Sequence, residues 1–321
     1  MSSTTDTVVR DWRPSDEPPV RDLVARRSFP DSLFLSSEQR REKVLQTLSQ
    51  HRDDLHEHPT LRCLIVEEQG QPVGYAVLAA HQVDGVTGDD QTELLDFYAP
   101  TPRPFEPLIA AARQRAIADG DSYIICNVYA SQKREAMWLA KERFVLESRR
   151  NVKVVQPGEK APEHPDYRLR RARQTETLFM MRLVGSHAPR YAPVGRRSNP
   201  EEVSGRFLSI YAGMDVRDRK KVPLVLVHRE EDYPVGYIIL QPGKVEAPGG
   251  PLTLYLYDVA MAEEKTGAGL GLYLHRGGIN LLGQMGGGLF YGDTAASNNL
   301  AQSAAETMGL IADSARWTLA L

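Results

Sequence analysis

The sequence predicts an α/β (α+β) protein of two tandem domains, each a mixed, mostly antiparallel sheet with flanking helices. The main observation is an internal repeat. Residues 72–78, PVGYAVL, recur 162 residues later as residues 234–240, PVGYIIL, and the same offset aligns Asp96 with Asp258. A second match follows at a slightly larger offset, since the dipeptide Ala-Ser occurs at both 130–131 and 296–297. The matches stay in order from residue 72 to 131 in the first copy and from 234 to 297 in the second, which indicates a duplicated domain.

The predicted boundaries are residues 1–186 for the N-terminal domain, 187–199 for a linker and 200–321 for the C-terminal domain. The linker sequence, HAPRYAPVGRRSN, is rich in Pro, Gly, Ser and Arg and shows no hydrophobic periodicity.

The first copy alternates strand and helix patterns. A strand over 8–12 precedes helices over 16–27 and 37–52. Residues 62–67 and 73–79 form a predicted hairpin around Gln69-Gly70, and a central strand over 93–98 follows. The remaining elements are a helix over 108–118, a strand over 122–128, a helix over 133–143 and closing strands over 144–154 and 177–183.

The second copy is expected to be shorter at its start. It opens with a helix over 200–214 and continues with a hairpin of residues 223–228 and 235–240. The acidic residues between the two hairpin strands, Glu230, Glu231 and Asp232, are expected to form a solvated charge run. The chain ends with a predicted strand over 317–321.

A glycine-rich turn follows the central strand of the second copy. Residues 252–257 alternate apolar and polar side chains as a strand does, and a polar turn leads to Gly267, Gly269, Gly271 and an apolar helical run. Glycines let an anion approach the backbone closely, and the N–H groups at a helix N-terminus point toward it. The sequence therefore predicts a phosphate or pyrophosphate site.

Other interpretations of the turn are weaker. No Gly-Lys-Ser/Thr follows the glycines, so a P-loop is excluded. A dinucleotide site, with Asp293 on the ribose, would need a third glycine that is missing from the spacing. A glycine-rich helix start without any ligand remains an alternative.

The first copy has prolines where the second has glycines. Its central strand is followed by PTPRPFEP, residues 100–107. Since proline has no N–H group to give a phosphate, pyrophosphate binding is expected to be weakened or lost there.

Two motifs of the second copy resemble those of the GNAT acyltransferase superfamily. Residues 266–271, TGAGLG, resemble its coenzyme A motif, Gln/Arg-x-x-Gly-x-Gly/Ala, with Thr266 in place of Arg or Gln. Residues 298–310 resemble its later motif, in which Asn298, Ala301 and Gly309 match, whereas Ala305 replaces the Tyr. With the repeat, the resemblance covers nearly the whole chain.

The resemblance implies an acyl-CoA cofactor, acetyl-CoA or another acyl-CoA. It places the thioester carbonyl near the backbone N–H of Ala260 or Met261 and the pantetheine arm near Asn298, which could equally be a plain N-cap. It places the pyrophosphate beside Lys265 on the backbone of six residues: Thr266, Gly267, Ala268, Gly269, Leu270 and Gly271.

The catalytic candidates are Asp293, Tyr257 and Asp258. Tyr257 and Asp258 are neighbours on the central strand and point to opposite faces, so only one of them can face the thioester. Asp258 also has a counterpart, Asp96, in the copy without glycines, which favours a structural role. In the family that the chain resembles, a Tyr usually returns a proton to the leaving CoA thiolate. The position of that Tyr is Ala305 here, so this acid is missing.

Composition limits the partners. The net charge is −3, which offers no general attraction to nucleic acid or to a membrane surface, and no apolar run is long enough to span a bilayer.

Cys63 and Cys126 lie in strand-like segments and are expected to be reduced, buried residues of a cytoplasmic protein. No metal-ligand spacing appears, and a monomer or homodimer is expected.

The function expected from the resemblance is transfer of an acyl group, most simply acetyl, from acyl-CoA to a small-molecule amine. The alternatives are a non-catalytic acyl-CoA-binding or regulatory protein and a nucleotide-dependent oxidoreductase.

Overall fold

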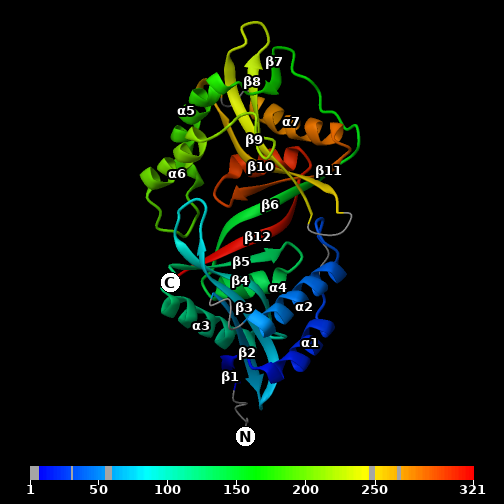
Figure 1. The fold of residues 1–321 in the computed structure, drawn as a ribbon, viewed down its shortest axis with the longest axis vertical. Helices are drawn as coiled ribbons and strands as arrows, with labels where there is room; N and C mark the ends of the chain where they lie inside the picture. Colours follow the sequence, from blue (N-terminus) through cyan, green and yellow to red (C-terminus); the bar gives the residue numbers. More distant parts are fainter. Residues whose placement is uncertain (1–6, 30–31, 55–59, 246–249, 266–268) are drawn as a thin grey trace. The chain divides into compact units, whose positions relative to one another are not determined.

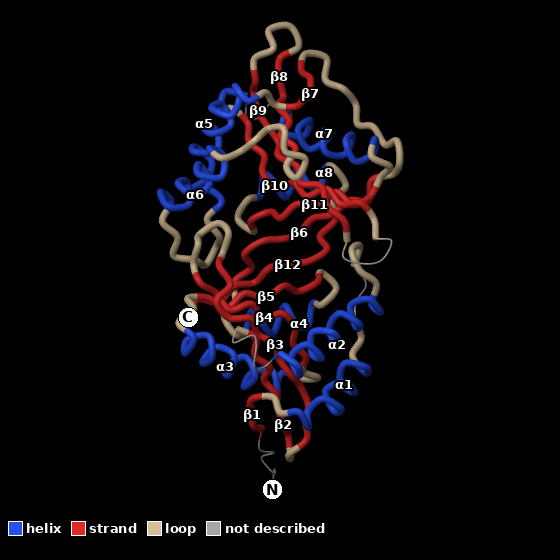
Figure 2. Tube along the Cα trace, in the orientation of Figure 1, coloured by secondary structure: helices blue, strands red, loops and turns tan. Residues whose placement is uncertain are grey.

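The structure is a computed structural model that describes residues 7–29, 32–54, 60–245, 250–265 and 269–321 (Figures 1 and 2). The chain forms two compact units. Unit 1 consists of Met1–Glu147 and Ser314–Leu321, and unit 2 of Ser148–Asp313. Each unit contains a mixed, mostly antiparallel sheet and flanking helices, so the predicted fold class is confirmed.

The sheet of unit 1 has the strand order β1-β2-β3-β4-β5-β12. Its pairs are antiparallel except β4 and β5, which are parallel. The strands are β1 Thr7–Asp11, β2 Leu61–Glu68, β3 Gln71–Val83, β4 Asp90–Tyr98, β5 Tyr123–Tyr129 and β12 Ile311–Ala320. The helices are α1 Glu17–Arg26, α2 Ser37–Asp54, α3 Pro102–Asp119 and α4 Lys133–Lys141.

The sheet of unit 2 has the equivalent order, β7-β8-β9-β10-β11-β6, and only β10 and β11 are parallel. The strands are β6 Val145–Val155, β7 Tyr167–Arg171, β8 Val222–His228, β9 Pro234–Lys244, β10 Leu252–Met261 and β11 Gly288–Ala295. The helices are α5 Thr177–His187, α6 Pro200–Ala212, α7 Leu270–Gln284 and α8 Asn299–Thr307. Figure 1 shows α5 and α6 on one side of these strands and α7 on the other.

The division of the chain differs from the predicted boundaries at 186 and 200. The last strand, β12, pairs with β5 and completes the sheet of unit 1, whereas β6 pairs with β11 and completes that of unit 2. The closing strands of the two copies are therefore exchanged. A repeat in the sequence fixes which segments are equivalent, but strand pairing decides which unit each segment joins.

The second copy also begins earlier than predicted. Residues 177–183, expected as a strand, belong to helix α5, whose buried residues Met180, Leu183 and Val184 follow helical spacing. Strand β7, just before them, pairs with β8 as β1 pairs with β2. The predicted linker over 187–199 contains the end of α5 and a short 3-10 helix, Ala188–Tyr191.

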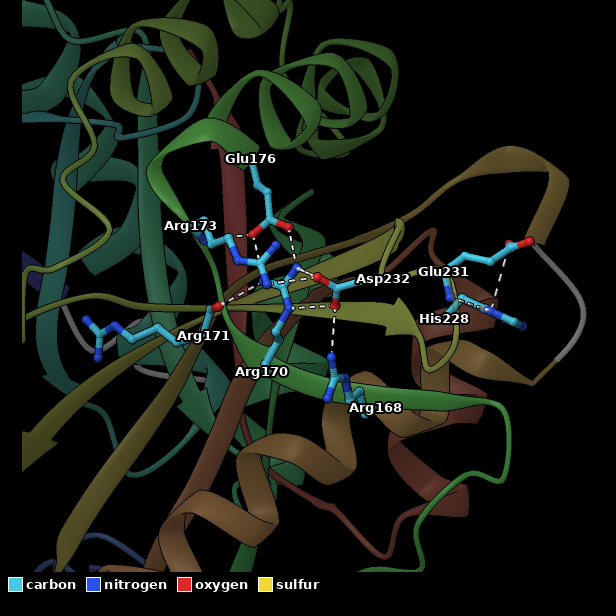
Figure 3. Close-up of polar contacts among 8 residues, drawn as sticks. All are labelled: Arg168, Arg170, Arg171, Arg173, Glu176, His228, Glu231 and Asp232. Atoms are coloured by element: carbon cyan, nitrogen blue, oxygen red, sulfur yellow. Dashed lines mark hydrogen bonds and ion pairs between the residues drawn. The ribbon is translucent and has the colours of Figure 1, made fainter.

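Both units have the same kind of ion-pair network, in which an arginine of the first strand binds two carboxylates. In unit 1, Arg10 donates to Asp16 at 2.7 Å and also to Glu67. In unit 2, Arg170 donates to Glu176 at 2.6 Å and to Asp232 at 3.2 Å (Figure 3). This pair of networks shows that the repeat extends to the first strand of each copy.

Asp232, expected to be solvated, is instead held by three arginines. Arg168 and Arg173 reach its carboxylate at 3.1 and 2.8 Å beside Arg170 (Figure 3). Hydrogen bonds from Arg170 and then Arg168 lower the pKa of Asp232 to about 2. Burial acts to raise the pKa of Glu176, but hydrogen bonds from Arg170 and from the Arg173 N–H outweigh it and leave this pKa below its usual value.

Apolar side chains fill the layer between each sheet and its helices. In unit 2, α7 packs on Ile238, Leu240, Leu254 and Phe290. Cys63 and Cys126 are free and buried in unit 1, as predicted, and burial raises the pKa of both thiols. Among the described residues, no helix combines the length and hydropathy needed to cross a membrane.

We expect Arg170→Gln to destabilise the protein by about 1.5–3 kcal/mol at neutral pH, because the buried Glu176 loses two charged hydrogen bonds. The Asp232 carboxylate loses its bonds from Arg170 as well. Both carboxylates have a folded-state pKa below the unfolded value. Their contribution is therefore complete above the unfolded pKa and is lost as the pH falls through the folded pKa. Urea unfolding of both proteins between neutral and acidic pH should show the difference shrinking below about pH 4.

The control is Arg21→Gln, which removes an exposed helical pair with Glu17 and should cost less than about 0.5 kcal/mol. A difference between wild type and Arg170→Gln that stays constant down to low pH would contradict the role of the two carboxylates.

Candidate active site

The central strand of unit 2 carries a β-bulge. The register of β10 against β9 shifts between Leu256 and Asp258, so Tyr257 is the extra residue. Strand β4 of unit 1 has the same shift at the equivalent position, between Leu94 and Asp96. A bulge turns the following side chains to the other face and bends the strand.

The two parallel strands diverge at this bulge. Pairing between β10 and β11 ends at Leu256 and Gly292. Beyond that point β10 continues along β9 as far as Met261, whereas β11 continues along β6. One edge of β10 after the bulge is therefore not paired with β11.

The backbone groups on this edge can be assigned from one hydrogen bond. Ala262 N–H donates to Val235 O at 2.8 Å. Because N–H groups alternate along a strand, Ala260 N–H also faces β9, whereas the N–H groups of Val259 and Met261 face the diverging edge. Val259 N–H donates to the Asp258 carboxylate at 2.8 Å. Of the two predicted carbonyl-binding groups, Met261 N–H faces the open side and Ala260 N–H does not.

Asp258 is a buried carboxylate with four donors. Oδ1 accepts from Tyr191 Oη at 2.6 Å and from Val259 N–H, and Oδ2 accepts from Tyr237 Oη at 2.8 Å and from Tyr211 Oη. Burial and the Asp258 charge raise the pKa of all three phenols, so they remain protonated donors. A carboxylate has about four acceptor positions, and all are used here. This geometry favours the structural role over that of a base.

The equivalent Asp96 of unit 1 has a cation instead. Arg27 Nη1 lies 2.8 Å from both carboxylate oxygens, and Tyr75 Oη donates to Oδ2 at 2.8 Å. The guanidinium also lies 4.6 Å from the centre of the Phe29 ring. Both units thus stabilise a carboxylate after the bulge, but with different donors.

His187 lies at the diverging edge and was not among the predicted site residues. It ends helix α5, and its Nε2 lies 3.1 Å from Met261 O. Its Nδ1 lies 3.4 Å from Arg190 Nη1. His187 lies in the predicted linker, where no periodicity or motif indicates a contact with the central strand.

Asp293 is engaged in a two-point ion pair. Arg150 Nε and Nη2 lie 2.9 and 3.0 Å from its two oxygens, and Tyr255 Oη donates to it at 3.3 Å. Arg150 also lies over the ring of Tyr291, 5.4 Å from its centre. Both oxygens of the Asp293 carboxylate are therefore engaged by donors. The third catalytic candidate, Tyr257, is half-buried, with Lys221 Nζ 3.9 Å from its ring centre.

Helix α7 begins where the glycine turn was predicted to bind phosphate. Thr266, Gly267 and Ala268 lie outside the described residues. Gly269 is the N-cap, with a left-handed φ of 73° that favours glycine, and Leu270 is the first helical residue. A Cβ added at Gly271 would meet no atom within 4 Å, so the first turn is open. These features fit an anion held by backbone N–H groups.

Lys265 lies just before this turn and interacts with two phenols. Hydrogen bonds with Tyr167 and Tyr233 raise the pKa of Lys265, which therefore remains a cation beside the start of α7. Asn298 is the N-cap of α8 and accepts from Ala301 N–H at 3.1 Å. Its side-chain oxygen thus serves the plain capping role that was considered as an alternative to ligand binding.

Unit 1 packs three aromatic rings together between β4, α3 and α4. Phe105 of α3 lies 5.7 Å from Phe97 of β4 and 5.2 Å from Trp138 of α4, measured between ring centres. The aligned residues of the second copy are small: Val259, Gly267 and Ala304. Helix α3 also begins with Pro102 and has a second proline at 104, so two N–H groups are missing from its first turn.

Comparison with known proteins identifies the fold. No family model matches the sequence, and no curated protein sequence matches it significantly. A GCN5-related N-acetyltransferase from Sphaerobacter thermophilus is similar with a TM-score of 0.55 and 15% identity, over 98% of this chain and 95% of that one.

Two further solved structures are similar. A glucosamine N-acetyltransferase region of a fungal multi-domain β-N-acetylglucosaminidase has a TM-score of 0.55 and 15% identity, over 99% of this chain and 38% of that one. A tandem GNAT protein from the clavulanic acid biosynthesis pathway has a TM-score of 0.47 and 14% identity, over 98% of each chain. The chain has the fold of the GCN5-related N-acetyltransferases.

Proposed function

We propose that the protein is an N-acyltransferase that uses acyl-CoA, most simply acetyl-CoA, and that its site lies in unit 2. The observation that carries this proposal is the combination at the end of β10. The strand leaves β11 at a bulge, presents Met261 N–H on the open edge, and leads within a few residues to the N-terminus of α7. One backbone donor for a carbonyl and several for a phosphate are thus carried by one continuous segment.

Each part of this segment has a chemical role. The N–H groups of Leu270 and Gly271, with the cationic Lys265, would hold the pyrophosphate. Met261 N–H would polarise the thioester carbonyl and stabilise the negative charge that develops on its oxygen. The thioester is already activated for acyl transfer, so the protein chiefly has to position the reactants and remove a proton from the acceptor.

The proposed acceptor is a small-molecule amine, and no nucleic acid or membrane takes part. A net charge of −3 supports this choice of partner. The solved glucosamine N-acetyltransferase region makes an amino sugar one reasonable member of an acceptor panel. The proposal includes a cytoplasmic, biosynthetic role as a monomer or homodimer.

A non-catalytic acyl-CoA-binding protein is the second candidate. Ala305 stands where the resemblance would have a tyrosine acid, and both candidate carboxylates are occupied by donors. Incubation of the protein with acetyl-CoA and a panel of primary amines that includes glucosamine separates the two. Release of free CoA that depends on the amine supports the enzyme, whereas binding without release supports the second candidate.

We expect Gly271→Val to weaken CoA binding at least tenfold, or about 1.4 kcal/mol, because its side chain would occupy the space above the first turn of α7. Gly271→Ala is the matched control for folding. Its Cβ meets nothing within 4 Å, and Ala favours a helix over Gly by about 1 kcal/mol, so thermal stability should not fall. Calorimetry on both variants is the measurement. Unchanged affinity in a folded Val variant would exclude this site.

We expect one CoA per chain, since prolines and aromatic rings occupy the equivalent region of unit 1. Arg103→Ala, in unit 1, should leave turnover unchanged, whereas Lys265→Ala should raise the KM for acyl-CoA. Titration calorimetry and steady-state kinetics test the two statements. Two equal binding sites per chain would show that Phe97, Phe105 and Trp138 do not close unit 1.

Asp258→Asn should lower the free energy of unfolding by about 1–3 kcal/mol, because an amide cannot accept all four hydrogen bonds in this buried position. Asp293→Asn is the matched comparison and should cost less than about 1 kcal/mol, since its pair with Arg150 is partly exposed. Thermal unfolding of the two variants measures the contrast. Equal losses would contradict the structural role of Asp258.

A further inference from the structure

We infer that His187 is the catalytic base of unit 2, which takes the proton from the acceptor amine at Nδ1. This inference rests on the proposed acyl transfer and adds the residue that carries its proton. Neither the fold nor the two motifs of the second copy assign a role to this histidine.

One hydrogen bond determines the tautomer of His187. Its Nε2 lies 3.1 Å from Met261 O, and a carbonyl oxygen can only accept, so Nε2 carries the proton. In the neutral ring Nδ1 then has the free electron pair. The partner of Nδ1 within hydrogen-bond distance is the exposed Arg190, at 3.4 Å. An acceptor amine can therefore replace an exposed, weakly held side chain.

The position of His187 follows from the geometry of β10. In an extended strand, the N–H and C=O of one residue point to the same side. Met261 O and Met261 N–H therefore share the edge at which β11 has diverged. A carbonyl held by this N–H would lie within a few ångströms of the imidazole, the range over which a base acts directly or through one water.

Comparison of the two copies supports a functional difference at this position. Helix α5 aligns with α1 at the offset that matches Arg170 with Arg10, and this offset places His187 opposite Arg27. In unit 1, Arg27 is committed to the ion pair with Asp96. In unit 2, three tyrosines satisfy Asp258 instead, and the end of α5 carries a titratable ring.

The other candidates for the base are less suitable. All four acceptor positions of Asp258 are occupied, and Asp293 is bound at two points by Arg150. Tyr257 lies beneath the ammonium group of Lys221. Among these residues, His187 alone combines contact with the open edge of β10 and a nitrogen whose partner is exposed.

One proton passes through His187 during the proposed acyl transfer. The amine nitrogen forms a bond to the acyl carbon while His187 Nδ1 accepts the proton from that nitrogen. The carbon–sulfur bond then breaks, the thiolate leaves, and the imidazolium returns its proton to the thiolate or to water. No further reactant is needed.

The test compares His187→Gln and His187→Ala with wild type, using acetyl-CoA and the amine that releases CoA fastest from the panel. Gln keeps a side-chain N–H for Met261 O but cannot accept a proton. We expect kcat/KM for the amine to fall by about 100-fold or more in both variants, with CoA affinity within about twofold of wild type. The acid side of the pH profile should lose one ionisation, and added imidazole should restore part of the activity of the Ala variant.

Long-range ¹H–¹⁵N NMR of His187 provides a readout that is independent of turnover. The spectra should show a protonated Nε2 and a bare Nδ1, and acetyl-CoA should shift these signals in wild type but not in Gly271→Val. His81→Gln, in unit 1, is the control and should leave kinetics unchanged. The opposite tautomer, or a Gln variant with the activity and pH profile of wild type, would overturn the inference while acyl transfer stands. Absence of CoA release by wild type would overturn both.

Discussion

The bulge in the central strand of unit 2 is the constraint on which the site depends. Beyond the extra residue at 257, β10 no longer pairs with β11 and has a strand partner on one edge only, β9. Asp258 adds further contacts there. Its carboxylate bonds the next backbone N–H and ties the strand to three phenols from β9, α6 and the segment after α5. The segment of β10 that β11 leaves is therefore tied to the rest of unit 2 by side-chain hydrogen bonds.

The two units share the same backbone features but differ in the side chains that surround the central strand. Both have the bulge, the diverging strands, a carboxylate after the bulge and an arginine network at the first strand. Unit 1 adds an ion pair through Arg27 and a cluster of three aromatic rings, which contribute packing. Unit 2 has small residues and a histidine in the equivalent places. Unit 1 thus has more side-chain packing around its central strand, whereas the proposed acyl-transfer site uses the smaller residues of unit 2.

The exchanged closing strands make the two copies depend on each other during folding. The sheet of unit 1 is completed only by the last residues of the chain, and that of unit 2 requires β6 from the end of the first copy. Each of these pairs joins strands that are far apart in the sequence. Bringing such strands together costs chain entropy before the contacts between them form. The Arg170 network stabilises the folded unit 2, because it joins β7 to the start of α5 and to the β8–β9 hairpin.

The sequence by itself determined the fold class, the duplication, most of the strands and the glycine start of α7. Each of these depends on local periodicity, on a repeat or on glycine chemistry, all of which can be read along the chain. Tertiary structure alone decided the exchange of β6 and β12 and the contacts of the polar side chains. Asp293 met Arg150, Asp258 met three tyrosines, and His187 met Met261 across 74 positions of sequence. No local pattern encodes such partners, because they are set by which strands and helices pack side by side.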